Sequence, residues 1–189
     1  MDAPRCVLVP MNFYKRLRHT YGFGVHSPFA YRMVKDVVRP GRGYAWYGYE
    51  DIDAGVNSSN ASLKIERQAK MFHRLISFLA PQSLFLPHGI APLFHTAAAT
   101  ADSRMRIERK PKNATECEMI ATHETFMPLE RLKAHLLTPG HSLVFMNMPS
   151  GWADTLFEAL PAGLMLHSPQ NAILIHRPEM MKVAYAILL

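Results

Sequence analysis

Four segments of this chain combine a short apolar run with polar residues that could do chemistry. They end at Leu86-Pro87-His88-Gly89, Glu108-Arg109, Asn147-Met148 and His176-Arg177. Buried parallel strands have continuous apolar runs, and open parallel sheets bind ligands beyond the carboxyl ends of their strands. We therefore expect the four ends to meet at one edge of a sheet and to form the site.

Each of these ends suggests a different chemistry. Gly89 would let a ligand approach the backbone closely, although an ordinary tight turn explains a lone glycine equally well. Glu108 could accept hydrogen bonds from both hydroxyls of a ribose, or could pair with a neighbouring arginine at the surface. Asn147 is neutral and cannot take up a proton. His176 could act as a base near neutral pH, although a histidine at a strand end is more often structural.

Several other chemistries lack support in the sequence. The ten histidines show no paired spacing of the HExxH kind, and two cysteines, Cys6 and Cys117, form neither a zinc site nor a disulfide framework by themselves. Neither Ser142, Ser150 nor Cys117 lies in a nucleophile elbow. We find no signal peptide and no apolar run long enough for a bilayer. We therefore expect a cytoplasmic protein with no metal site and no membrane partner.

Alternating strand and helix patterns would position the four ends. We predict strands at Ser83–Leu86, Met105–Glu108, Phe126, Ser142–Met146 and Ala172–His176. We predict helices from Pro28 to Val38 and over Ser62–Leu79, Pro92–Ala101, Ala114–Thr122, Leu129–Leu137, Trp152–Leu160 and Glu179–Leu188. This alternation predicts a Rossmann-like three-layer α/β sandwich with a mostly parallel sheet of about five strands and an N-terminal helical appendage.

The chain divides into an N-terminal helical segment with a loop, residues 1–61, and a core, residues 62–189. We expect residues 1–10 to be loosely attached and the irregular stretch Gly41–Ala61 to cover the site. The core pattern stops inside the last predicted helix, so the core is expected to be incomplete at its C-terminus. Ala172–His176 would then be a sheet edge, and we expect a homodimer through it.

The charge of the chain is basic, with 21 Lys and Arg against 15 Asp and Glu and a net charge of +6. A basic domain can bind nucleic acid or an anionic ligand. The positive residues are scattered, however, and no aromatic-rich nucleic-acid motif accompanies them. Charged residues on solvent-exposed helix faces explain the positive net charge better than a nucleic-acid-binding site does.

One segment carries a resemblance to a known family. Tyr21-Gly22-Phe23-Gly24-Val25-His26-Ser27-Pro28-Phe29 resembles the H-G-[FIV]-H-S-P-F signature of a bacterial group of class I S-adenosylmethionine-dependent methyltransferase-like proteins. The segments SLFLPHGIAPLF, SLVFMNM and NAILIHRPEM are similar to the first, fourth and fifth strand regions of that family. The resemblance extends over roughly residues 12 to 185.

The resemblance implies a transferase site for S-adenosylmethionine and a methyl acceptor whose identity it does not specify. Glu108 would hold the ribose of the cofactor. His88 and Gly89 would line its methionine side, and Asn147 would complete the cofactor site. His26 and His176 would contact the acceptor.

Departures from the family pattern change this expectation. Of the glycines in the family's E-L-G-T-x-x-G loop only Gly89 is present, and Asn147 stands where the family has an aspartate. His176 and Arg177 occupy the positions of paired aspartates, and Glu108 alone keeps its acid. The resemblance therefore implies a degenerate, weak or inactive methyltransferase-like protein. The alternative is a pseudoenzyme, a non-catalytic binding or scaffold domain on the same fold that could also bind RNA.

Overall fold

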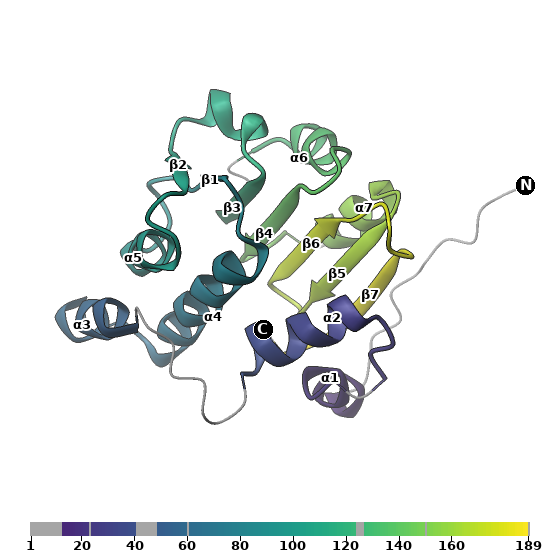
Figure 1. Ribbon diagram of the computed structural model, residues 1–189, viewed down its shortest axis with the longest axis horizontal. Helices are drawn as coiled ribbons and strands as arrows, with labels where there is room; N and C mark the ends of the chain where they lie inside the picture. The colour runs from purple at the N-terminus through teal and green to yellow at the C-terminus, as the bar shows by residue number, and fades with distance from the viewer. Residues whose placement is uncertain are drawn as a thin grey trace, which may run out of the picture.

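A mostly parallel sheet of seven strands forms the centre of the protein (Figure 1). The computed structural model describes residues 13–22, 24–40, 49–59, 61–123, 127–149 and 151–188. In chain order the strands are β1 (Ser83–Phe85), β2 (Arg106–Glu108), β3 (Met119–His123), β4 (Ser142–Met146), β5 (Gly163–His167), β6 (Ala172–His176) and β7 (Val183–Ala186). Their order across the sheet is β2-β1-β3-β4-β6-β5-β7.

Six of these strands run in the same direction, and β6 runs antiparallel between β4 and β5. The carboxyl ends of the six parallel strands therefore lie along one edge of the sheet, which we call the carboxyl edge. The end of β6 lies at the opposite edge. The predicted α/β class with a mostly parallel sheet is confirmed, but the sheet has seven strands rather than about five.

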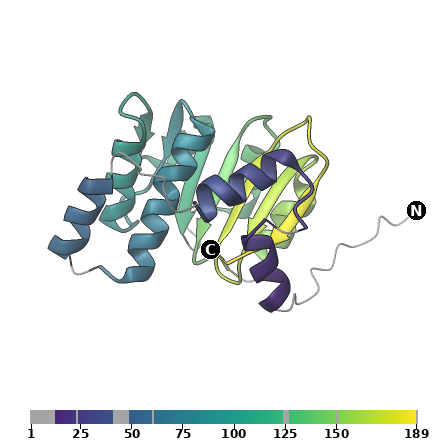
Figure 2. The ribbon, with the colours of Figure 1, turned by 60° about the horizontal axis from the view of Figure 1, so that its bottom comes forward.

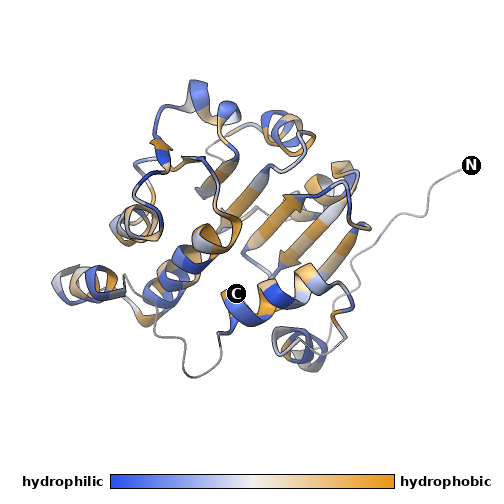
Figure 3. Ribbon diagram, viewed as in Figure 1, coloured by the Kyte–Doolittle hydropathy of each residue, from blue (hydrophilic) through white to orange (hydrophobic). Residues whose placement is uncertain are grey.

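Helices cover both faces of the sheet (Figure 2). They are α1 (Phe13–Thr20), α2 (Pro28–Arg32), the π-helix η1 (Met33–Val38), α3 (Tyr49–Ser59), α4 (Leu63–Leu79), α5 (Pro92–Ala101), the 3-10 helix η2 (Pro111–Glu116), α6 (Leu129–Leu136) and α7 (Trp152–Ala159). Alternate strand residues point to opposite sides. In β4, Val144 joins the core with α4 and α5, whereas Leu143 and Phe145 join the core with α6 and α7. The strands accordingly form the apolar centre of the molecule (Figure 3).

The helix α4 leads directly into the sheet and shows why the chain folds in this way. Its N-cap, Ser62, accepts a hydrogen bond from the Ile65 N–H at 3.4 Å, and Phe72, Leu75 and Ile76 are buried on its inner face. Capping and an apolar stripe at helical spacing together favour a helix here, as predicted. Because α4 precedes β1 and runs antiparallel to it, its first turns lie at the carboxyl edge.

The signature segment forms a second capped helix. The Ser27 hydroxyl accepts a hydrogen bond from the Ala30 N–H at 3.3 Å, and Pro28 occupies the first helical position, as predicted. The Phe29 ring lies 5.6 Å from the Phe78 ring of α4. These contacts attach α2 to α4, so the segment has a structural role.

The structure corrects four sequence predictions. Tyr49–Ser59 is the helix α3, not irregular chain, and Met119–His123 is the strand β3, not helix. β5 had no counterpart among the predicted strands, and the predicted last helix is replaced by β7. Residues 1–10, residues 41–48 and the predicted strand at Phe126 lie outside the described residues.

The expected sheet edge at Ala172–His176 is wrong. This segment is β6, which pairs with β4 on one side and β5 on the other. The expected homodimer was inferred from an exposed edge at this strand, so that argument no longer holds.

Candidate functional site

The chain order reverses next to β1, and this reversal marks the candidate site. From β1 the chain moves to β2 on one side and then crosses to β3 on the other. Loops diverge at such a switch point and leave a crevice at the carboxyl ends of the two strands. We therefore examined the residues that follow β1, β2 and β3.

The structure brings three predicted residues together at this switch point. The Leu86 N–H donates to the Glu108 carbonyl oxygen at 2.9 Å, so the turn with His88 and Gly89 lies beside the end of β2. A side chain at Gly89 would lie 3.4 Å from His123 Cε1, at the end of β3. That is ordinary van der Waals contact, so packing within the chain does not require glycine here. Gly89 is exposed in this turn.

The Glu108 carboxylate is held in one orientation. Its Oε1 accepts from the backbone N–H groups of Lys110 at 2.7 Å and Arg109 at 2.8 Å, and its Oε2 accepts from Asn113 Nδ2 at 3.2 Å. Hydrogen bonds from the Lys110 N–H, the Asn113 side chain and the Arg109 N–H lower the pKa of the Glu108 carboxyl below its ordinary value. The group is an oriented anion, and Oε2 retains a lone pair for a ligand hydroxyl.

Two histidines that the sequence analysis did not select, His95 and His123, lie near His88 and Gly89. The His95 ring of α5 lies 6.3 Å from the His88 ring, and His88 is exposed. Burial, followed by the nearby positive charge of Arg109, lowers the pKa of His95. His95 is therefore neutral near pH 7. The apolar run Met119-Ile120-Ala121 could have indicated a strand ending near His123. The prediction of a helix over Ala114–Thr122 obscured this signal.

An orphaned polar atom also lies at this edge. The Thr122 side chain in β3 is fully buried, and its hydroxyl has no hydrogen-bond partner in the described part of the chain. Buried hydroxyls normally have a partner. Thr122 is thus an unsatisfied polar group one residue before the end of β3.

Asn147 lies at the same edge, two strands from β1. Its backbone is left-handed, with φ of 55°, and its N–H donates to Asn171 Oδ1 at 3.4 Å. The side chain follows β4, as predicted, and is exposed. β3 separates it from the turn that holds Gly89.

His176 does not lie with these residues, so the expectation that all four strand ends meet at one edge is wrong for it. Because β6 is antiparallel, its end lies at the opposite edge, where the His176 N–H donates to the His141 carbonyl oxygen at 3.0 Å. His26 also lies elsewhere, since its N–H donates to the Tyr185 hydroxyl of β7 at 3.3 Å. β7 is the edge strand farthest from β2. The structure therefore does not bring either predicted acceptor contact next to Glu108.

Two further observations concern the described residues as a whole. Within the described ranges, no group of three or more His, Cys, Asp or Glu side chains could hold a metal ion. No described helix has the length and apolar composition needed to cross a membrane.

Comparison with protein-family models, curated proteins and solved structures finds no match to this chain. The function must therefore be argued from the site itself.

Proposed function

We propose that this protein is a methyltransferase-like domain that binds S-adenosylmethionine at the switch point beside β1 and has weak or no transferase activity. The observation that supports the proposal is the oriented Glu108 carboxylate at the end of β2, a strand end whose backbone lies beside the exposed turn that holds Gly89. Glu108 Oε2 would accept a hydrogen bond from a ribose hydroxyl, and the turn with His88 would line the methionine side. The bound cofactor would supply an electrophilic methyl group on its sulfonium.

The composition of the carboxyl edge supports weak rather than efficient catalysis. Of the described strands that end there, only β2 ends on a carboxylate. β4 is followed by the neutral Asn147, and His176 lies at the opposite edge. Methyl transfer can proceed by positioning alone, but an acceptor that must lose a proton needs a base. The alternative is therefore a scaffold or binding domain that has lost the cofactor altogether.

The proposal includes a cytoplasmic location. Cys117 is a buried free thiol, and a reducing compartment preserves such thiols.

Isothermal titration with S-adenosylmethionine and S-adenosylhomocysteine tests the proposal. We expect saturable binding by the parent protein and at least about tenfold weaker binding by Glu108→Gln, because the neutral amide is a weaker acceptor. Glutamine can still accept from the Arg109 and Lys110 N–H groups, so the fold should persist. Glu116→Gln, an exposed glutamate of η2, is the matched control and should bind within about twofold of the parent.

Absence of binding at millimolar cofactor, with intact fold, would reject the proposal in favour of the scaffold alternative. Equal affinities of the Glu108 and Glu116 variants would reject the assignment of Glu108.

A further inference from the structure

A groove of about 680 Å³ lies on the sheet face covered by α4, away from Glu108. Its walls are α4, the end of η1, the end of α1 and Leu188 beyond β7. Five cationic side chains line it: Arg39, Lys64, Arg67, Lys70 and Arg74. The end of the described chain lies between α4 and α2 in both ribbon views (Figures 1 and 2). We call this feature the basic groove.

Contacts between distant parts of the chain hold the groove together at the carboxyl edge. Lys64 Nζ donates to Oε1 of Gln170, in the turn between β5 and β6, at 3.4 Å. The Leu188 N–H, just beyond β7, donates to the Thr20 hydroxyl at the end of α1 at 2.9 Å. The groove is therefore built from four elements rather than from one exposed helix face.

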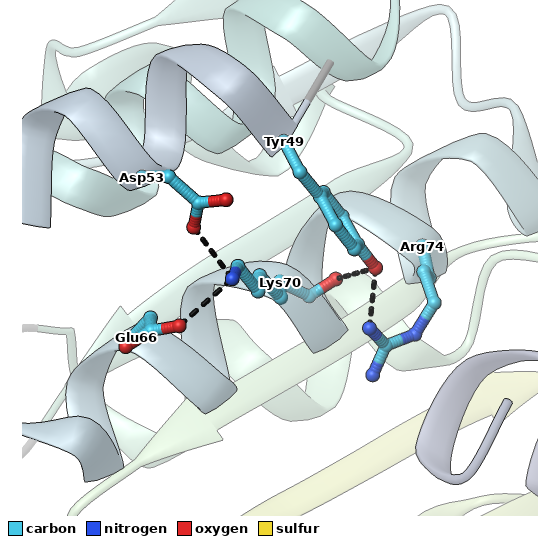
Figure 4. A network of polar contacts seen from close by, with 5 residues as sticks. All are labelled: Tyr49, Asp53, Glu66, Lys70 and Arg74. Atoms are coloured by element: carbon cyan, nitrogen blue, oxygen red, sulfur yellow. Dashed lines mark hydrogen bonds and ion pairs between the residues drawn. The ribbon is translucent and has the colours of Figure 1, made fainter. Parts of the chain in front are cut away.

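Lys70 is the one groove cation with carboxylate partners in the described residues. Its Nζ lies 2.5 Å from Asp53 Oδ1 and 2.7 Å from Glu66 Oε1 (Figure 4). The two carboxylates neutralise this ammonium group. Lys70 therefore positions α3 against α4 and is not available for a ligand anion.

Arg74 is buried, but its hydrogen bonds go to neutral groups. The residue is only 7% exposed. Its Nε donates to the Val37 carbonyl oxygen at 2.7 Å, and its Nη1 donates to the Tyr49 hydroxyl. That hydroxyl in turn donates to the Lys70 carbonyl oxygen at 3.4 Å (Figure 4). Buried charges in proteins are normally paired with an opposite charge. This guanidinium at the groove wall has no carboxylate partner in the ranges that the structure describes.

The other three cations are not neutralised either. The Arg39 guanidinium lies 4.0 Å from the centre of the Tyr21 ring, and Lys64 contacts only an amide oxygen. Arg67 is exposed on α4. No carboxylate pairs with these three side chains in the described residues. Four of the five groove cations, the buried Arg74 among them, therefore lack a carboxylate partner within the described ranges.

We propose that the basic groove binds a small organic phosphate. Its phosphate group would lie against Arg39, Arg67 and Arg74, because guanidinium groups match phosphate oxygens in charge and geometry. An apolar part of the ligand would lie against Val38, Met71 and Leu188, which also line the groove. The volume lies within the usual range of roughly 300–1,000 Å³ for small-molecule sites. This inference does not depend on the proposed cofactor site, since S-adenosylmethionine carries no phosphate.

The experiment uses phenyl phosphate as the probe and the full chain in a phosphate-free buffer at low salt. Titration calorimetry measures affinity, and ¹H–¹⁵N spectra follow the arginine Nε–H signals. The Arg74 Nε–H donates to a buried carbonyl, so its signal should be observable and should shift on binding. We expect saturable binding, weakened at least about tenfold in the double variant Arg39→Gln with Arg67→Gln, because two charge-assisted contacts are lost.

The matched control is Arg32→Gln with Arg104→Gln. These two arginines are exposed, with side chains 72% and 93% accessible, and neither lines the groove. The control removes the same charge and should bind within about twofold of the parent. Glu108→Gln should also leave phenyl phosphate binding unchanged, which separates this site from the proposed cofactor site.

Three results would overturn the proposal. One is equal loss of affinity in the groove and control variants, which would show only a general charge effect. The second is the absence of saturable binding when phenyl phosphate is added at about tenfold or higher molar excess over the protein. This test extends up to about the millimolar concentrations at which weak sites bind. The third is retention of single-stranded RNA, lost in the groove variant, without binding of phenyl phosphate.

A further variant, Arg74→Lys, keeps the charge but not the planar guanidinium group. It should bind phenyl phosphate more weakly than the parent protein while remaining folded.

Discussion

His141 Nδ1 lies 3.1 Å from His135 Nδ1, and this contact couples the tautomers of the two rings in the folded protein. His135 Nε2 lies 2.9 Å from the Ser142 carbonyl oxygen and must therefore donate to it. His135 Nδ1 is then an unprotonated acceptor, and His141 donates the shared proton. A second proton on His135 would require His141 to shift its own proton from Nδ1 to Nε2.

We expect this pair to make stability depend on pH. Burial lowers the pKa of His135 to about 4 in the folded protein, whereas an unfolded histidine has its ordinary value of 6.5. The unfolded chain therefore binds the proton first as the pH falls. Stability is fully present above pH 6.5 and is lost between there and about pH 4, by roughly 3 kcal/mol for this group.

Urea unfolding at pH 7.5 and pH 4.5 measures this dependence. His135→Gln should lose stability at pH 7.5 but should show a smaller loss between the two pH values than the parent. His88→Gln, at an exposed histidine, is the control and should keep the parental dependence. An unchanged dependence in His135→Gln would assign the effect to other histidines.

Removal of the Tyr49 hydroxyl should destabilise the protein. Tyr49→Phe leaves Arg74 Nη1 without its acceptor in a buried position, and we expect a loss of about 2 kcal/mol. Tyr31→Phe, at a residue 44% exposed, should change stability by less than about 0.5 kcal/mol. Thermal and urea unfolding of both variants provide the comparison, and similar stabilities would show that Arg74 finds another acceptor.

Ala80→Gly should stabilise the protein. Ala80 ends α4 in a left-handed conformation with φ of 48°, and its N–H donates to the Ile76 carbonyl oxygen at 2.7 Å. Glycine adopts this conformation without strain, so we expect a gain of about 0.5–1 kcal/mol. Ala99→Gly, exposed within α5, should instead lose about 1 kcal/mol. Chemical denaturation decides between them, and a loss in both variants would contradict the assignment.

Gly163→Ala should prevent stable folding. Gly163 begins β5 with φ of 121°, and a Cβ there would overlap the Ile175 carbonyl oxygen of β6. Relief would require separating two paired strands, so we expect a loss of about 3 kcal/mol or more. Gly140→Ala, with φ of 82° but nothing within 4 Å, should lose only about 1 kcal/mol. Circular dichroism melting curves measure both, and equal losses would show that conformation rather than the overlap dominates.

The helices with clear end signals could be predicted from the sequence. Ser62 and Ser27 supply capping hydroxyls, and α5 has the predicted bounds Pro92–Ala101. β1, β2, β4 and β6 were also recognisable as apolar runs. Such signals are local, so they persist whatever the rest of the chain does.

Strand direction and the final strands could not be predicted in the same way. The run Ala172–His176 is apolar throughout, which identifies burial but not orientation. Its antiparallel placement depends on pairing with β4 and β5, and β5 was not predicted. The placement of His176 failed for the same reason, whereas Gly89 and Glu108 lie together because their strands are parallel neighbours.

The reversed strand β6 also has a consequence for the order of folding. The turn that joins β5 to β6 is short and closed by the Ser168 N–H, which donates to the Asn171 carbonyl oxygen at 2.8 Å. Hairpins of this kind form within microseconds, whereas β1 and β3 meet only after a crossover through β2. In pulsed hydrogen exchange we therefore expect the amides of β5 and β6 to become protected before those of β1. Simultaneous protection of all three strands would indicate that the sheet assembles in one cooperative step.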